Sequence, residues 1–497
     1  MVFGNAPRAL RPYICSSCAK SLKLRSRKFA TAASPDIYDV ACVGGGPAGL
    51  SLLTALRSSK ATSHLRLALI ESQDLDRVRK WNLPPDQYSN RASSLTPSSQ
   101  AFLSQIGAWP HIDTSRVQPY HHMRVWDGLS STARITFDSP TPEPAIAHMI
   151  ENQNLTRALL ARLDSLEPIS LLDKTSVREI HLGPPPSPLT PEPTYLNLSS
   201  YPHVTLSSNQ TIAARLLIGA DGPNSAVRTF AGIETRGYDY NRDGVVATLK
   251  LPSSFAHHPS SPRGVTAYQR FLPSGPIALL ALPGPYASLV WTTTPSQSAL
   301  LKTLSPEDFT AMVNAAFRLS AVDLNYMFTL PSNQLSEFQW RDSVHPSTAS
   351  EAKGEIPHLI SSVQQGSIAS FPLRLRHASS YTTSRIALIG DAAHTIHPLA
   401  GQGLNMGLSD SKALAEAIEY AVCHGADIGD EMGCLDRYKG EVWWGNQRLL
   451  GAVDKLHWLY SVGSGPVVGV RKWGLRAVDV MGDLGVKGWL MRQAGGL

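Results

Sequence analysis

The chain has 497 residues, of which 42% are hydrophobic and 17% are charged. This is an ordinary globular composition, and the length suffices for two or three domains with sizeable cores. No run of 18 or more apolar residues occurs, which argues against a transmembrane helix. The formal net charge of +6 at first suggests an acidic partner.

The positive charge lies mainly at the N-terminus. Residues 1–34 carry seven basic residues and no acidic one, and they are rich in Ser and Ala. Without them the formal charge falls from +6 to −1, so nucleic-acid binding loses its main support. A basic segment of this kind, with no long apolar core, is typical of a mitochondrial transit peptide. A disordered basic tail is the alternative.

Residues 36–71 are predicted to form one βαβ unit. Tyr38 to Val43 is a short apolar strand, the sequence GGGPAG follows, and apolar residues at helical spacing begin at Leu50. A second strand runs from Leu65 to Glu71.

The glycine motif of this unit predicts a dinucleotide site. Gly44 permits a tight turn, Gly46 lets the backbone approach a pyrophosphate, and Gly49 lets the helix pack closely on the strand. The N-terminus of the helix offers free N–H groups to the phosphates. Glu71, 22 residues after Gly49, is placed to accept hydrogen bonds from an adenosine ribose.

Two further buried strands end in an aspartate. The stretch ARLLIGAD ends at Asp221, and SRIALIGD ends at Asp391, where the carboxyl edge of an open α/β sheet binds ligands. Pro398, Gly401 and Gly403 then form a tight loop before a helix predicted from about Leu404. The positive end of that helix would favour a ligand that carries negative charge.

The three motifs, in this order over some 360 residues, resemble the fingerprints of the aromatic-ring flavin hydroxylases, the class that includes para-hydroxybenzoate hydroxylase. The resemblance implies non-covalent FAD and an α/β fold: a Rossmann-like FAD-binding domain, discontinuous in sequence, an α+β substrate domain with an antiparallel sheet, and a C-terminal helical tail. It also implies that Arg91 reaches the flavin and that Asp391 binds the hydroxyls of its ribityl chain. The N-terminus of the helix from about Leu404 would then stabilise the negative charge of the reduced flavin ring, and Asn405 would bond the ring's pyrimidine edge. The predicted FAD-binding residues are Gly44, Gly46, Gly49, Glu71, Arg91, Asp221, Asp391, Pro398, Gly401, Gln402, Gly403, Leu404 and Asn405.

The predicted domains follow from this placement of the motifs. The FAD-binding domain takes residues 36–100, 150–230 and 370–430, the substrate domain 101–149 and 231–369, and the helical region 431–497. A Pro-rich loop at 183–195, between two strand-like segments, and a polar, mobile linker at 345–358 are also expected. The basic, Trp-bearing C-terminal region is predicted either to lie at a membrane or partner surface or to pack on its own domain.

Other stretches resemble the ubiquinone-biosynthesis branch of this class. They include HMIENQNLTRAL, AYQRFLPSGPIALLAL and HPLAGQGLNMGLSD. The mitochondrial members of that branch hydroxylate ring position C5 of a polyprenylated 4-hydroxybenzoate-type precursor. Gly-Tyr in TRGYDYNRDGVV, where many relatives have Gly-Trp, leaves substrate details open.

The resemblance implies that reduced FAD reacts with O₂ to give a C4a-hydroperoxide, whose distal oxygen the phenol ring attacks. No metal is required, and no catalytic base can be named. Tyr268, Gln269 and Arg270 are weak candidates for the substrate pocket, whereas His394 and His397 are assigned to packing rather than to catalysis. Implied partners are the polyprenylated phenol, O₂, a biosynthetic enzyme complex and the matrix side of the mitochondrial inner membrane. A ferredoxin with its NADPH-dependent reductase is the implied electron donor, and it could meet a basic patch that includes Lys455, Arg471 and Lys472.

Other interpretations remain open. The chain could hydroxylate a different ubiquinone ring position or a soluble phenol. It could instead be a mainly structural subunit that holds FAD. Inhibitors of prenylated GTPases share the βαβ unit but would not need the motifs at Asp221 and Asp391.

Overall fold

The computed structural model describes residues 35–130, 133–139, 145–183, 197–255, 264–397 and 401–461. The chain divides into two units, residues 1–36 and 37–497. The predicted leader, nearly all of the Pro-rich loop, Pro398 and the last 36 residues, with Arg471 and Lys472, lie outside the described residues.

Among the described residues, one sheet has eight strands, with the order β18-β19-β11-β1-β2-β8 and with β10 and β9 continuing from β11. Its strands are β1 (Asp36–Val43), β2 (Leu67–Ile70), β8 (Ser170–Leu172), β9 (Val177–Leu182), β10 (Pro202–Leu206), β11 (Thr211–Gly219), β18 (Thr382–Thr383) and β19 (Ile386–Leu388). β1 and β2 are parallel and are joined by helix α2 (Pro47–Ser58), so the predicted βαβ unit is confirmed. The three buried strands predicted from the sequence, β1, β11 and β19, are neighbours in this sheet.

A second sheet has nine strands within the described part of the chain, ordered β20-β17-β12-β15-β14-β13-β5-β6, with β16 beside β12. These are β5 (His122–Asp127), β6 (Arg134–Asp138), β12 (Thr235–Lys250), β13 (Thr266–Leu272), β14 (Gly275–Ala281), β15 (Tyr286–Thr293), β16 (Ser362–Val363), β17 (Ala369–Ala378) and β20 (His394–Thr395). The predicted antiparallel pairing holds for β12, β14, β15 and β17. The pairing of β5 with β13 is parallel instead.

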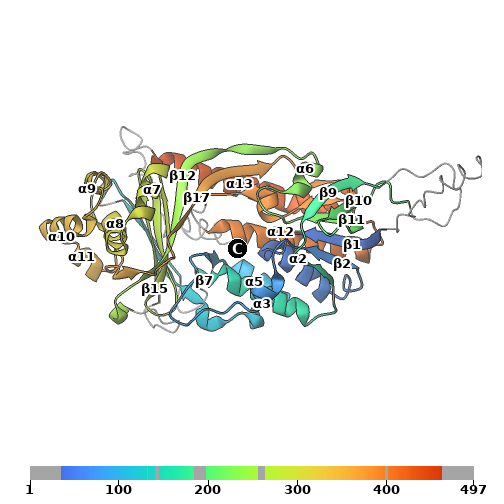
Figure 1. Ribbon diagram of the computed structural model, residues 1–497, viewed down its shortest axis with the longest axis horizontal. Helices are drawn as coiled ribbons and strands as arrows, with labels where there is room; N and C mark the ends of the chain where they lie inside the picture. The colour runs from blue at the N-terminus through green and yellow to red at the C-terminus, as the bar shows by residue number, and fades with distance from the viewer. Residues whose placement is uncertain are drawn as a thin grey trace, which may run out of the picture. The chain divides into compact units, whose positions relative to one another are not determined.

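The two faces of the nine-stranded sheet differ. One face packs on a helical layer, which Figure 1 shows beside strands β12 and β15, and Trp291, Phe309 and Phe317 lie in the shared core. The layer comprises α7 (Pro295–Thr303), α8 (Pro306–Arg318), α9 (Ala321–Met327), α10 (Gln334–Val344) and α11 (Thr348–Ala352). The opposite face, here called the inner face, meets Tyr88 and Met149 through Ala267 and Tyr286.

The linker predicted at 345–358 is wrong as a mobile segment. It contains α11, and Glu351 within it pairs with Arg318 and with His358. The polar composition of the segment therefore reflects ion pairs with the helical layer.

A small third sheet and two long helices complete the described fold. Strands β3 (Ala92–Leu95), β7 (Ala147–Glu151) and β4 (Gln118–Tyr120) pair in that order. The remaining helices are α3 (Leu75–Arg79), α4 (Pro97–Gln105), α5 (Asn152–Asp164), α6 (Ala226–Phe230), α12 (Gln402–Cys423) and α13 (Asp436–Ser461), with short helical turns η1 (Trp109–His111), η2 (Thr114–Arg116), η3 (Ser253–Phe255), η4 (Gly390–Ala392) and η6 (Glu431–Leu435). No helix in the described ranges is both long enough and apolar enough to cross a membrane.

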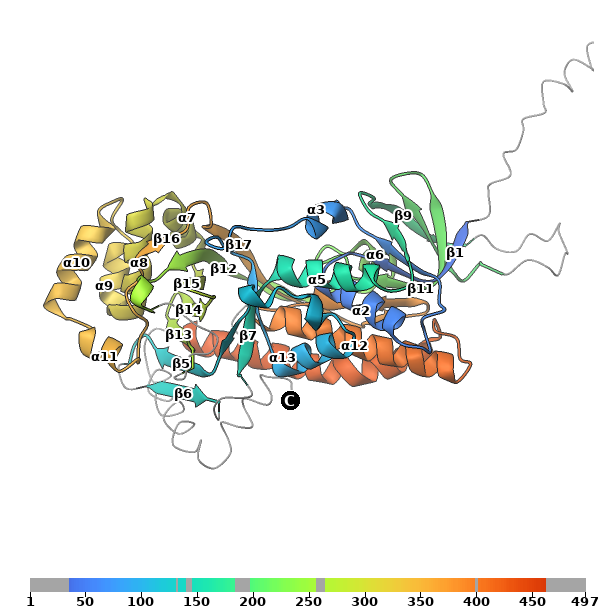
Figure 2. The same ribbon diagram turned by 90° about the horizontal axis from the view of Figure 1, so that it is seen from below.

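Helix α13 shows how the described part of the C-terminal region is held. Figure 2 shows it running alongside α12, which it contacts. Its buried residues recur every fourth position, at Tyr438, Val442, Asn446 and Leu450, which is the spacing of one helix face. Residues 436–461 therefore pack on their own chain, as one of the two interpretations predicted.

Candidate active site

The glycine loop lies between the ends of β1 and β11. A Cβ on Gly44, whose φ is +110°, would stand 2.2 Å from the carbonyl oxygen of Ala220, so only glycine fits there. Gly46 is different, because no atom lies within 4 Å of the place a Cβ would take. Gly46 is also the N-cap of α2 and provides no side-chain cap, so the first N–H groups of α2 are open to a ligand.

Glu71 stands beside the same loop, at the end of β2. Its carboxylate is buried and accepts hydrogen bonds from Gly45 N at 2.5 Å and from Gln73 N at 2.7 Å. A carboxylate has about four acceptor positions, so these bonds fix its orientation and leave capacity for a ribose hydroxyl.

Asp221 follows β11 and has one occupied and one open oxygen. Its Oδ2 accepts from Ala226 N at 2.8 Å, at the start of α6. Its Oδ1 is buried and has no hydrogen-bond partner among the described residues. Because burying such an atom without a partner is costly, the open Oδ1 fits a ligand that donates a hydroxyl hydrogen.

Asp391 lies in the turn after β19. The preceding Gly390 has a φ of +59°, and Arg228 holds the turn by donating from Nη1 to Ala392 O at 2.8 Å. The Asp391 side chain is exposed to solvent, yet desolvation by the surrounding protein, together with the charge of Asp410, raises its pKa against the opposing effect of His394. The Asp391 carboxylate is therefore within reach of a ligand that approaches from solvent at the end of β19.

Sequence reasoning missed the side chain that joins this turn to α12. Asp410 Oδ2 accepts from Gly390 N at 2.9 Å and lies 2.6 Å from His394 Nε2, and Asp410 Oδ1 accepts from Asn446 Nδ2 at 3.0 Å. Both side chains of the His394–Asp410 pair are fully buried. A signal was present, because Asp410 lies between Met406 and Leu414 on the buried stripe of α12, where an acid requires a partner.

The ion pair with Asp410 stabilises the protonated form of His394. Burial opposes protonation, but Asp410, with a further contribution from Asp391, raises the pKa of His394 above its usual range. The assignment of His394 to packing is consistent with this geometry. His397 is also buried and its ring contacts that of Tyr240 at 5.1 Å.

We expect His394→Gln to remove a pH dependence of stability. The raised pKa means that the native state holds a proton that the unfolded state releases near pH 6.5, so the stabilisation is full below that pH and is lost as pH rises through the native pKa. The variant should lose about 3–5 kcal/mol at pH 6, because the buried Asp410 loses its charged partner and keeps only its bonds from Gly390 N and Asn446 Nδ2. Urea unfolding at pH 6 to 9 measures both effects.

The control for this prediction is His424→Gln, because His424 is exposed at the C-terminus of α12. That variant should keep the slope of the native chain. Equal slopes for the native chain and His394→Gln would contradict the assignment.

The N-terminus of α12 is organised by Asn405. Its Oδ1 accepts from Thr96 N at 3.0 Å and from Ser99 Oγ at 2.8 Å, and its Nδ2 donates to Ser94 O at 2.8 Å. The amide is therefore engaged with β3 and α4, which argues against its predicted bond to the flavin ring.

Gly401, Gly403 and Leu404, which were also predicted to bind the cofactor, lie at or near the first turn of α12. Gly401 is the left-handed N-cap of α12 and provides no side-chain cap, and α12 begins at Gln402, two residues earlier than predicted. A Cβ on Gly403 would meet only Ile396, at 3.7 Å, and Leu404 packs against the main core. The open N–H groups at this end suit a ligand that carries negative charge.

The structure separates the three weak substrate candidates on β13. Arg270 is buried and donates to Ala316 O at 2.9 Å and to Leu319 O at 2.8 Å, so it caps the end of α8. Tyr268 packs against the same helical core. Because side chains alternate along a strand, Gln269 points to the inner face. Tyr268 and Arg270 therefore face the helical layer, on the opposite side of the sheet from Gln269.

Taken together, these positions fit FAD. The ends of β19, β11, β1 and β2 place Asp391, Asp221, the glycine loop and Glu71 side by side along one edge. The N-terminus of α2 and the open space at Gly46 suit phosphates. The Asp221 oxygen that has no partner among the described residues and the solvent-accessible Asp391 suit hydroxyl groups. Arg91 is the last residue before β3 of the third sheet, and its side chain is exposed.

Comparison with known proteins decides the family. A family model described as "FAD binding domain" matches residues 37–326 and 325–441. Curated relatives named "Ubiquinone biosynthesis monooxygenase COQ6, mitochondrial" include those of Saccharomyces cerevisiae, at 38% identity over 96% of this chain and 98% of the relative, and Homo sapiens, at 35% identity over 92% and 93%. The chain belongs to the COQ6 family of ubiquinone biosynthesis monooxygenases. Its cofactor is FAD, and it is an FAD-dependent monooxygenase.

Solved structures support the fold of this COQ6 family member. PqsL, a probable FAD-dependent monooxygenase from Pseudomonas aeruginosa, aligns with a TM-score of 0.63 at 16% identity and covers 89% of this chain and all of that one. The p-nitrophenol 4-monooxygenase PnpA from Pseudomonas putida DLL-E4 aligns with a TM-score of 0.61 at 16% identity and covers 93% and 98%. At these identities the likeness concerns the fold alone, and it confirms the predicted fold class.

Proposed function

We propose that the chain hydroxylates ring position C5 of a polyprenylated 4-hydroxybenzoate-type precursor during ubiquinone biosynthesis in the mitochondrion. The observation that carries the proposal is the similarity to curated COQ6 monooxygenases, at 33–38% identity over at least 90% of the chain. The position of the FAD motifs along one edge of the eight-stranded sheet supports the FAD-dependent part of this activity.

FAD supplies the activation of O₂, and the chain's residues hold it in place. In this proposal Gly46 and the N-terminus of α2 hold the pyrophosphate, and Glu71 holds the adenosine ribose. Asp221 and Asp391 bind hydroxyl groups of the cofactor. The open N-terminus of α12 faces the ring and favours negative charge there.

The substrate ring is placed on the inner face of the nine-stranded sheet. Ala278, Val290 and Val246 continue the cross-strand row that starts at Gln269. These small apolar side chains offer a flat surface to an aromatic ring, and the Gln269 amide offers a hydrogen bond at its edge. An unchanged KM of Gln269→Ala for the phenolic substrate would remove Gln269 from this role.

Electrons are proposed to come from a ferredoxin and its NADPH-dependent reductase. Lys455 is exposed on α13 and could contribute to the basic patch that would meet an acidic ferredoxin, while Arg471 and Lys472 lie outside the described residues. Association with the matrix side of the inner membrane and with a biosynthetic complex is part of the same proposal, because the polyprenyl substrate is a membrane lipid. The purified enzyme should be reduced by NADPH only when ferredoxin and its reductase are both added; direct reduction by NADPH alone would contradict this.

Lipid extraction from a deletion strain tests the reaction. We expect a polyprenylated precursor that lacks only the C5 oxygen, and its disappearance when the native chain is restored. Accumulation of an intermediate blocked at another ring position would replace the proposal with a different hydroxylation. A normal ubiquinone content would favour a soluble phenol as substrate.

A further inference from the structure

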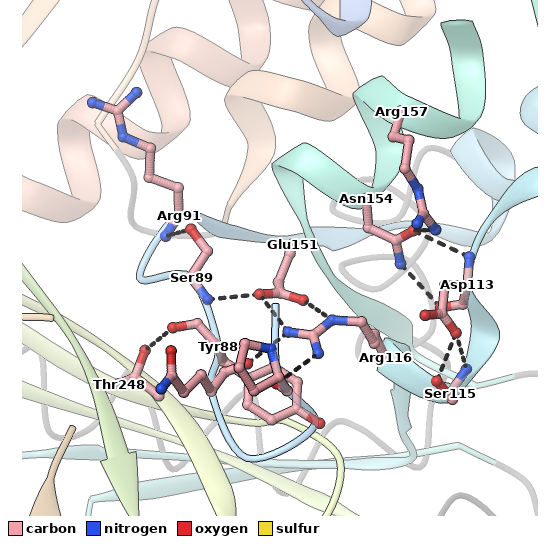
Figure 3. A network of polar contacts seen from close by, with 12 residues as sticks. Tyr88, Ser89, Arg91, Asp113, Ser115, Arg116, Glu151, Asn154, Arg157 and Thr248 are labelled. Atoms are coloured by element: carbon pink, nitrogen blue, oxygen red, sulfur yellow. Dashed lines mark hydrogen bonds and ion pairs between the residues drawn. The ribbon is translucent and has the colours of Figure 1, made fainter. Parts of the chain in front are cut away.

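The loop between α3 and β3, residues 81–91, contains no helix or strand but is held from two sides. Figure 3 shows its residues Tyr88, Ser89 and Arg91 at the edge of a polar network centred on Glu151 and Arg116. Arg91, the predicted flavin contact, is the last residue of this loop.

One side of the loop is fixed by a buried ion pair. Arg116 Nε donates to Glu151 Oε2 at 2.6 Å and Arg116 Nη2 donates to Glu151 Oε1 at 3.0 Å, and both side chains are at most 7% exposed. The pair then binds the loop backbone: Arg116 Nη2 donates to Gln87 O at 2.7 Å, and Glu151 Oε1 accepts from Ser89 N at 2.6 Å. A forked guanidinium in this position fixes direction as well as distance.

The other side of the loop is tied to the nine-stranded sheet. Tyr88 N donates to Gln364 Oε1 at 2.9 Å, and Tyr88 O accepts from Gln364 Nε2 at 2.9 Å and from Thr248 Oγ1 at 3.2 Å. Asn90 Nδ2 donates to Ser367 O at 2.5 Å. The Tyr88 ring lies between Arg116, at 4.5 Å, and Tyr286, at 5.1 Å. The loop thus bridges β7, which carries Glu151, and the proposed substrate sheet.

The backbone of Arg91 is held by hydrogen bonds at the end of this loop, while its side chain is exposed. Arg91 N donates to Ser89 Oγ at 3.2 Å, and Arg91 O accepts from Asn152 N at 3.0 Å. The side chain is exposed and extends away from the network in Figure 3. Neither Glu151 nor Arg116 has an exposed surface with which to meet a ligand itself.

We propose that Glu151, together with Arg116, is a positioning residue for the cofactor: the pair fixes loop 81–91 and so holds Arg91 where its guanidinium reaches bound FAD. The inference rests on the FAD site of the proposed function and not on the identity of the hydroxylated ring carbon. It also joins the substrate sheet to the flavin contact, because the same loop is bonded to both.

A double-mutant cycle on FAD affinity tests the proposal. Titration of apoprotein with FAD should show that Glu151→Gln and Arg91→Met each raise the Kd about tenfold, as expected when a ligand-contacting group or its orienting partner is lost. The double variant should be no weaker than Arg91→Met alone, because Glu151 acts through Arg91. The flavin midpoint potential should fall in Arg91→Met, because that variant removes a positive charge that stabilises the reduced flavin. Glu151→Gln removes a negative charge, so a fall of the potential in that variant would report the displacement of Arg91 from the flavin.

Two further variants separate positioning from general stability. Ser89→Ala keeps the ion pair and removes only the Oγ that accepts from Arg91 N, so it should reproduce part of the rise in Kd while folding normally. Glu351→Gln breaks the Arg318–Glu351 pair in the helical layer, where Arg318 is 2% exposed, and it should leave the Kd and the potential unchanged.

The outcomes are distinguishable. An additive effect of Glu151→Gln in the Arg91→Met background would overturn the positioning role and leave the FAD site intact. An unchanged Kd in Arg91→Met would overturn the Arg91 contact and the inference with it. The proposed C5 hydroxylation depends on the lipid analysis and would survive either result.

Discussion

The Gly46→Val variant is expected to fold normally and to purify without FAD, with its affinity for FAD lowered at least about a hundredfold. Gly46 has a φ of −73°, which any residue adopts, and no protein atom lies within 4 Å of its missing Cβ. The space that the valine side chain fills is therefore the space that the pyrophosphate needs. Absorbance of the purified protein and titration with FAD measure the loss, and thermal unfolding of the apoprotein checks the fold.

Substitutions at two other glycines serve as controls for this prediction. Gly44→Ala should fail to fold, because its Cβ would stand 2.2 Å from Ala220 O in a backbone conformation that only glycine tolerates. Gly440→Ala, in α13 and with open space around the new Cβ, should keep both FAD and stability. A Gly46→Val protein with full flavin content would show that the loop does not hold the cofactor.

The Asp391→Ala variant should lose FAD affinity while its apoprotein becomes more stable at neutral pH. The loss, about tenfold to a hundredfold, follows from removing a charged hydrogen-bond acceptor for a cofactor hydroxyl. The gain follows from the raised pKa of Asp391: a carboxylate that the native state desolvates destabilises the fold once pH rises above the carboxyl's unfolded pKa near 4. The native apoprotein should therefore lose stability from pH 4 upward more steeply than the variant.

Thermal unfolding of both apoproteins between pH 4 and pH 8 checks this second prediction. The exposed Glu419 on α12 provides the control, because Glu419→Ala should change neither the affinity nor the slope. A less stable Asp391→Ala apoprotein at pH 8 would mean that the carboxylate has a structural partner rather than a ligand.

Much of the site could be predicted because short-range sequence patterns encode it. Glycines at fixed spacing after a strand, and aspartates directly after buried strands, specify local turns whatever the rest of the chain does. Strand neighbours β1, β11 and β19 then bring these turns together. The βαβ unit followed from such patterns, whereas the fold class and FAD followed from the resemblance that the three motifs together carry.

Features that depend on partners distant in sequence could not be predicted in this way. Arg270 belonged to a family-like strand, but its partners are the last carbonyls of α8, some 46 residues onward. The bonds of Asn405 to Thr96 and Ser99 span about 300 residues, and no local pattern indicates them. The segment around Glu351 was predicted to be a linker because of its polar composition. The composition does not reveal that Glu351 forms an ion pair with Arg318.

The predicted domain boundaries at residues 100, 150, 230, 370 and 430 remain a prediction. The sheets show why a boundary is difficult to draw from sequence. β17, which begins at Ala369, lies in the nine-stranded sheet, yet β18 and β19 return to the eight-stranded sheet within eight residues of its end. The chain crosses between the two sheets with hardly any linker.

The order of strands along the eight-stranded sheet also constrains how the protein can be made. The cofactor edge needs β1 and β2 from the start of the chain, β11 from the middle, and β19 with Asp410 from far downstream. A chain that emerges or is imported N-terminus first presents its glycine loop long before the opposite wall of the pocket exists. FAD can therefore be captured only after nearly the whole chain has arrived, and truncation anywhere before Asp410 leaves an early segment with no cofactor to stabilise it.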